Sequence, residues 1–244
     1  MLRVIFSLIL TLITGTAVAD VASLKAISEA IEASYIDLDR NDGPGCAVGY
    51  ARDGKLIHQR QFGMANLEHR IPIDATTIFR TGSTSKQFVA ASIALLSLQG
   101  KLDLDEDIHS LLPSLPDYGT AVTIRQMVNH SSGIPDIYRV LSEIYGDEDG
   151  NFYPSEKTLE HLYQMARLDF VPGSQYAYSN SAYLLLAQAV EAASGQTMRE
   201  FAAEHIFKPL GMHNSHFHDN HRELVKNRAD GYFEIDGQWE KRNT

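Results

Sequence analysis

The chain has 244 residues, of which 44% are hydrophobic and 21% charged, as in an ordinary folded globular protein. Its formal net charge of −10 disfavours nucleic acid as a partner, because phosphate binding needs a basic surface. The single cysteine, Cys46, excludes an internal disulfide, and we interpret it as a small core residue.

The first residues have the pattern of an export signal. Arg3 precedes an apolar run over 4–13, and Ala17 and Ala19 form a small-x-small cleavage site. The apolar run is too short to span a bilayer. We therefore predict a signal peptide over 1–19, no stable membrane anchor, and a periplasmic or secreted mature chain.

The next segments predict a helix and then a β-hairpin. Apolar residues recur at helical spacing over 24–35. Strand-like runs over 46–51 and 55–62 flank the pair Asp53-Gly54, which is a hairpin turn signal because glycine accepts a positive φ.

The middle of the chain is mainly helical by the same criteria. Residues 87–99 are almost all apolar or small, which predicts a helix buried on nearly every side that ends at Gly100. Further apolar periodicity predicts helices over 122–128, 159–168, 182–193 and 197–207, the last capped by Thr197.

The last part returns to strand. Alternation around Asp236-Gly237 predicts a second hairpin over 231–240. The order of elements indicates an α+β protein in which a helical region is inserted between two parts of one antiparallel sheet. We predict one domain over 20–244, with a sheet region at 20–78 and 208–244 and a mainly helical region at 79–207.

A serine and a lysine stand where the loop before the most apolar helix enters it. Ser83 and Lys86 are three residues apart, so their side chains share one face of a helix. A serine hydroxyl needs a base to act as a nucleophile, and burial disfavours the charged form of a lysine. The alternative is a solvated helix start with a surface lysine.

A phenol and an amide precede the second apolar helix. Tyr178 could share a proton with Lys86, and Asn180 could hold a substrate amide and the lysine together. The alternative is a core tyrosine followed by a capping asparagine.

The Ser-x-x-Lys motif and the later Tyr-x-Asn motif resemble those of the serine β-lactamase-related family. That family includes class C β-lactamases, D-Ala-D-Ala carboxypeptidases, D-amino-acid peptidases and esterases. The resemblance implies a β-lactamase/transpeptidase-like fold. It also implies that Ser83 is acylated, that Lys86 and Tyr178 activate it and later the attacking water, and that Asn180 binds substrate. No cofactor is implied, and the expected partner is a small-molecule or peptide substrate.

The family's third motif, Lys-Thr-Gly or His-x-Gly, supplies a second oxyanion donor, and neither string occurs here. We therefore expect the sequence to be C-terminally incomplete, with the last strands missing. An alternative is a non-catalytic periplasmic binding or scaffold module that kept the cleft and lost this motif. A weaker alternative is a Ser-His-Asp esterase using His130, but no Gly-x-Ser-x-Gly elbow occurs, and we interpret residues 129–135 as a structural turn.

Four histidines near the C-terminal end are potential zinc ligands, since imidazole is a common one. They are His213, His216, His218 and His221. Their spacing matches no structural zinc site, so we predict no metal. The sequence predicts no particular oligomeric state.

Overall fold

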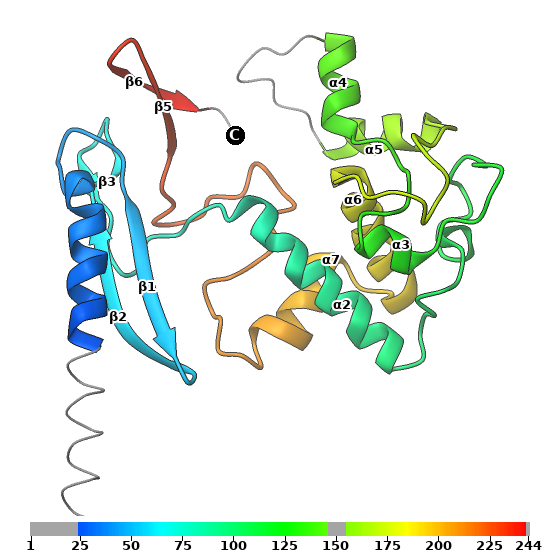
Figure 1. The fold of residues 1–244 in the computed structure, drawn as a ribbon, viewed down its shortest axis with the longest axis horizontal. Coiled ribbons are helices and arrows are strands. Elements are labelled where there is room, and N and C mark those ends of the chain that lie inside the picture. Colours follow the sequence, from blue (N-terminus) through cyan, green and yellow to red (C-terminus); the bar gives the residue numbers. More distant parts are fainter. Residues whose placement is uncertain (1–23, 146–154, 243–244) are drawn as a thin grey trace, which may run out of the picture. The chain divides into compact units, whose positions relative to one another are not determined.

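The computed structural model of the chain describes residues 24–145 and 155–242 (Figure 1). The predicted signal peptide over 1–19 lies outside the described residues. The described chain divides into two compact units. Unit 1 holds residues 24–80 and 225–242, and unit 2 holds residues 81–145 and 155–224. Residues 208–224, which the sequence prediction placed in the sheet region, thus cluster with the helices.

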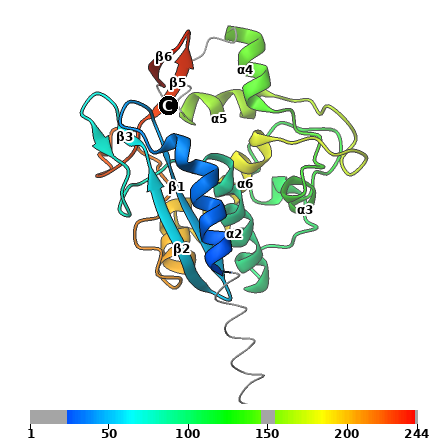
Figure 2. The ribbon, with the colours of Figure 1, turned by 60° about the vertical axis from the view of Figure 1, so that its left-hand side comes forward.

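Unit 1 begins with a helix over 24–35 that lies along a hairpin made by β1 (Cys46–Arg52) and β2 (Lys55–Phe62) (Figure 2). The predicted hairpin is confirmed by the antiparallel pairing of β1 with β2, and Asp53 and Gly54 at its turn have φ values of 52° and 71°. The Tyr35 ring stacks on the Phe62 ring at 5.9 Å between centroids, which fastens the helix to the hairpin.

The other strands of unit 1 are β3 (Met64–Asn66), β4 (Ile71–Pro72), β5 (Gly231–Ile235) and β6 (Gln238–Arg242). The second predicted hairpin, β5–β6, is confirmed. The predicted α+β class, with a helical region inserted between two strand-bearing parts of the chain, is confirmed. The described strands form three separate two-stranded antiparallel ladders and not the single sheet that was expected. The chain just before β5 is joined to β3 by a backbone bond from Asp230 N–H to Ala65 O, 2.9 Å long.

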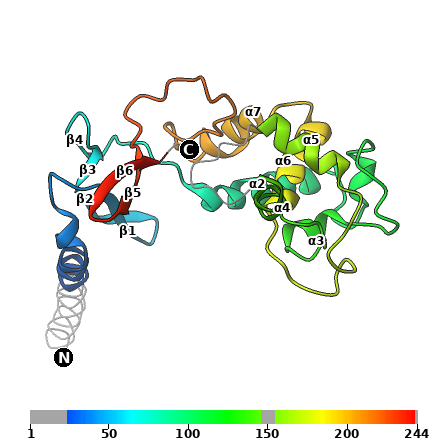
Figure 3. The ribbon, with the colours of Figure 1, turned by 90° about the horizontal axis from the view of Figure 1, so that it is seen from above.

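Unit 2 holds the helices α2 (Lys86–Leu98), α3 (Ile124–Val128), α4 (Ile137–Tyr145), α5 (Ser155–Gln164), α6 (Asn180–Ser194) and α7 (Met198–Ala202). Helices α2, α6 and α7 pack against one another around the core of the unit (Figure 3). The core includes Ile93 and Leu96 of α2, Leu185 and Leu186 of α6, and Phe201 of α7. This packing fixes the N-terminal ends of α2 and α6 relative to each other.

The ends of these helices follow their local sequence. Thr197 forms the predicted cap of α7, in a capping box with Glu200. The helix predicted over 197–207 is interrupted, because its second half, Ala203–Phe207, is a π-helical turn. Gly195 ends α6 in the left-handed conformation, with φ of 74°.

Helix α2 is less completely buried than its composition predicted. Val89, Ile93 and Leu96 are buried on one face. Ala94 is exposed, and Leu98 is 86% exposed, on the opposite face. An all-apolar pattern does not show which side of a helix its neighbours cover.

Among the described residues, no helix combines the length and apolar character needed to cross a membrane.

Candidate active site

Ser83 and Lys86 lie at the start of α2, in unit 2. Ser83 belongs to a short 3-10 turn, Gly82–Ser85, and Lys86 is the first residue of α2. The Lys86 ammonium donates a hydrogen bond to Ser83 Oγ over 3.1 Å. The turn therefore places the two side chains together as their spacing predicted.

Tyr178 and Asn180 lie at the start of α6, on either side of Ser179. Ser179 has extended dihedral angles, φ −135° and ψ 115°, and its hydroxyl caps α6 by accepting from Ala182 N–H. Ser179 is buried. Because successive side chains of an extended chain point to opposite sides, Tyr178 and Asn180 share the side opposite to Ser179. This alternation explains why the two functional groups are two residues apart.

The two helix starts bring all four predicted site residues together. The Tyr178 phenol donates to Ser83 Oγ over 2.7 Å. Lys86 Nζ also donates to Asn180 Oδ1 over 2.7 Å, and it lies 4.8 Å from the centre of the Tyr178 ring. The serine oxygen thus receives hydrogen bonds from both the phenol and the ammonium.

The environment of these groups is wetter than the sequence reasoning assumed. Ser83 is exposed and the Tyr178 residue is 44% exposed, while Lys86 is half-buried. Partial desolvation acts to raise the pKa of the Tyr178 phenol, but its interactions with Lys86 and Ser83 outweigh this effect, and the pKa is lowered. Hydrogen bonds and the charge of Lys86 therefore favour the ionised phenol, whereas desolvation opposes it.

His130 contacts the Tyr-x-Asn segment through a hydrogen bond and a ring contact. Its Nδ1 accepts from Ser179 N–H over 3.1 Å, and its ring centre lies 4.5 Å from that of Tyr178. Burial, assisted by the nearby charge of Lys86, lowers the pKa of His130, so the neutral ring that accepts this bond is favoured. Within the described residues, no hydrogen bond joins His130 to Ser83, which is the contact that a Ser-His-Asp esterase would need.

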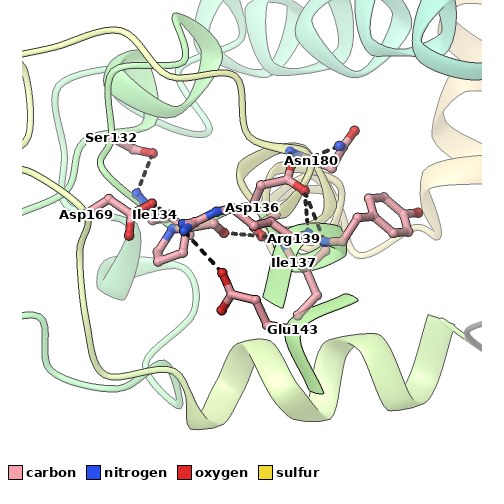
Figure 4. A network of polar contacts seen from close by, with 11 residues as sticks. Ser132, Ile134, Asp136, Ile137, Arg139, Glu143, Asp169 and Asn180 are labelled. Atoms are coloured by element: carbon pink, nitrogen blue, oxygen red, sulfur yellow. Dashed lines mark hydrogen bonds and ion pairs between the residues drawn. The ribbon is translucent and has the colours of Figure 1, made fainter. Parts of the chain in front are cut away.

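Asp136 is a residue that the sequence reasoning missed. One carboxylate oxygen accepts from both the backbone N–H and the side-chain amide of Asn180, at 2.6 and 2.9 Å (Figure 4). The only local signal is an aspartate immediately before an apolar helix, a pattern that predicts a cap and nothing more.

The histidine-rich segment is also partly assembled. Donor atoms of His216, His218 and Glu223 lie within 4.8 Å of one another, while His213 and His221 are not part of this group. Both Glu223 oxygens, however, accept from Arg199, at 2.5 and 2.8 Å, and this pairing lowers the pKa of Glu223 to about 2. A metal ion would have to compete with the guanidinium for the carboxylate, so the absence of a metal stays our prediction.

Known proteins resemble this chain in sequence and in fold. The family model that matches is that of beta-lactamase, over residues 29–233. Penicillin-binding protein 4* of Bacillus subtilis is 31% identical over 184 residues, covering 75% of this chain and 39% of that protein. A D-aminopeptidase of Brucella anthropi is 34% identical over 195 residues, covering 79% of this chain and 35% of that enzyme.

Solved structures agree. EstCE1, described as a hydrolase with promiscuous acyltransferase activity, superposes with a TM-score of 0.72 at 27% identity, over 92% of this chain and 60% of that one. The chain thus spans little more than a third of the length of the two curated relatives. The fold is the β-lactamase/transpeptidase-like one, and the chain belongs to the beta-lactamase family.

Proposed function

We propose that the chain carries the catalytic centre of an exported serine hydrolase that works through an acyl-enzyme on Ser83. One observation supports this most directly: Ser83 Oγ lies within hydrogen-bond distance of both the Tyr178 phenol and the Lys86 ammonium. Covalent catalysis needs a nucleophile that is hydrogen-bonded to a base, with the base oriented by a third group. Here Ser83 is the nucleophile, Tyr178 the base and Lys86 the third group.

The proton of the Ser83 hydroxyl moves along the hydrogen bond between Ser83 and Tyr178. With the phenol ionised, Ser83 Oγ–H donates its proton to the phenolate as Oγ forms a bond to the substrate carbonyl carbon. The proton then passes to the leaving nitrogen or oxygen as the bond from that atom to the carbonyl carbon breaks. Water attacks the acyl-enzyme, gives its proton to the phenolate, and Ser83 recovers a proton as the acid leaves. Lys86 stabilises the phenolate, in keeping with the lowered pKa of Tyr178.

Asn180 is the proposed substrate-binding group. Its amide nitrogen has two hydrogens, and Asp136 accepts one of them. The second hydrogen suits a carbonyl oxygen of the substrate. β-Lactams, D-amino-acid peptides and esters all present such a carbonyl. Similarity to a D-aminopeptidase favours D-amino-acid peptides, and similarity to a penicillin-binding protein favours β-lactams.

The second candidate is a non-catalytic binding module. These 244 residues contain neither Lys-Thr-Gly nor His-x-Gly. Loss of one oxyanion donor typically lowers the rate by about 10²- to 10³-fold, so such a chain could bind without turning over.

A substrate panel separates the two candidates. The chain is assayed with a cephalosporin, a D-aminoacyl amide and a short-chain ester, with the Ser83→Ala variant as blank. Turnover of one substrate that Ser83→Ala abolishes supports the hydrolase, whereas binding of the substrates with no turnover supports the module. Activity that survives Lys86→Ala and disappears in His130→Ala would instead favour the esterase alternative.

A further inference from the structure

We propose that Asp136 is a positioning residue that fixes the side-chain amide of Asn180 in the one orientation in which it accepts from Lys86. The inference rests on the proposed function and adds a residue to its machinery. Asp136 is hydrogen-bonded to Asn180 and, among the described residues, not to Ser83, Lys86 or Tyr178, so it acts chiefly through Asn180.

The geometry leaves the amide one favourable orientation. Asp136 Oδ2 accepts from Asn180 N–H at 2.6 Å and from Asn180 Nδ2 at 2.9 Å (Figure 4). A carboxylate only accepts and an ammonium only donates. If the amide were flipped, its oxygen would face the carboxylate and its NH₂ would face the Lys86 ammonium. Asp136 and Lys86 therefore select the same orientation from opposite ends, with Oδ1 at 2.7 Å from Lys86 Nζ.

The carboxylate itself is held by the start of α4. Its second oxygen, Oδ1, accepts from the N–H groups of Tyr138 and Arg139, at 3.0 and 3.4 Å, in the manner of a helix cap. The flanking segment is fixed to α6 by Ser181, which donates to Pro135 O and accepts from Ile137 N–H. Each oxygen of Asp136 thus has its own set of donors, one set on α4 and the other on Asn180.

The result is an unbroken series of hydrogen bonds from Asp136 through Asn180 and Lys86 to Ser83. Such bonds strengthen one another when charged groups stand at their ends. With Asp136 removed, Asn180 could turn, and Lys86 would lose the acceptor that holds it beside Ser83. We therefore expect slower reaction at Ser83 without loss of the fold.

Asp136→Ser is the informative variant, because serine also caps helices but is too short to reach Asn180 while it does so. Asp136→Asn is the second variant, since its NH₂ must oppose the donors either of Asn180 or of α4. We measure the rate of labelling by a fluorophosphonate probe against probe concentration. Both variants should reduce the limiting rate by about 10- to 100-fold, the range expected when a catalytic group is misplaced. The matched control is Asp169→Asn. The native Asp169 carboxylate accepts from Arg139 in the same network, and its replacement should leave the labelling rate unchanged.

A double-mutant cycle separates positioning from a structural role. If Asp136 acts through Asn180, then Asp136→Ser should slow labelling less than about twofold in an Asn180→Ala background. The same 10- to 100-fold loss in both backgrounds, or labelling of Asp136→Ser at the parent rate, would overturn the inference. Rapid labelling of the parent chain that Ser83→Ala abolishes would still support the proposed function in either case. A parent chain that does not label at Ser83 would overturn both.

Discussion

Replacement of Ser181 by alanine tests how the site is supported. The Ser181 hydroxyl is fully buried, donates to Pro135 O over 2.5 Å and accepts from Ile137 N–H over 2.8 Å. Ile137 is also fully buried, so water cannot readily replace the lost partner. A net contribution of about 0.5–1.5 kcal/mol for each of two hydrogen bonds gives a loss of about 2 kcal/mol in the free energy of unfolding.

The matched control is Ser92→Ala in α2. Ser92 is equally buried, but its hydroxyl donates only to Phe88 O, four residues earlier in the same helix. That bond is an addition to the helical ladder, so its loss should change the free energy of unfolding by no more than about 0.5 kcal/mol. Urea unfolding followed by circular dichroism measures both variants, and hydrogen exchange at the Ile137 amide shows whether the loss is local. Equal stability of the two variants, within about 0.5 kcal/mol, would show that the two bonds of Ser181 contribute no more than the one bond of Ser92.

Two further predictions concern single residues of unit 2. Gly133 has φ of 79°, and an added Cβ would lie 2.3 Å from Phe170 O, whereas Gly195 has φ of 74° and open space around it. Thermal unfolding should therefore show Gly195→Ala destabilised by about 1–2 kcal/mol and Gly133→Ala by clearly more, and equal losses would contradict the clash. Burial acts to lower the pKa of His109, but hydrogen bonds to Asp107 and to a backbone carbonyl outweigh this effect, so the pKa is raised. The pKa of His130 is lowered, mainly by burial. An NMR titration should place the midpoint of His109 above that of His130. Because its pKa is raised in the folded chain, His109 should increase the free energy of unfolding at pH values below its unfolded pKa. Because its pKa is lowered, His130 should decrease the free energy of unfolding as pH falls below its unfolded pKa of about 6.5.

Features set by a few neighbouring residues could be predicted from the sequence. The Asp-Gly pairs at 53–54 and 236–237 demanded positive φ, and both form hairpin turns. Thr197 forms a capping box with Glu200, which lies only three positions later in the chain. Ser83 and Lys86 were predicted to meet for the same local reason.

Features that depend on distant contacts could not be derived in this way. The meeting of Ser83 with Tyr178 spans 95 residues and was expected only because the two motifs resemble a known family. The role of Asp136 is invisible locally, since its partner Asn180 lies 44 residues away. The exposed face of α2 and the separation of the strands into three ladders depend on which neighbours are present, which apolar periodicity does not specify.

The most direct test is to locate the covalent adduct that the chain forms with a fluorophosphonate probe, by mass spectrometry of its peptides. We predict a single adduct on Ser83, absent from Ser83→Ala and retained in Ser85→Ala, which changes a neighbouring serine of the same turn. An adduct on any other residue, or equal labelling of Ser83→Ala, would contradict the assignment of the nucleophile.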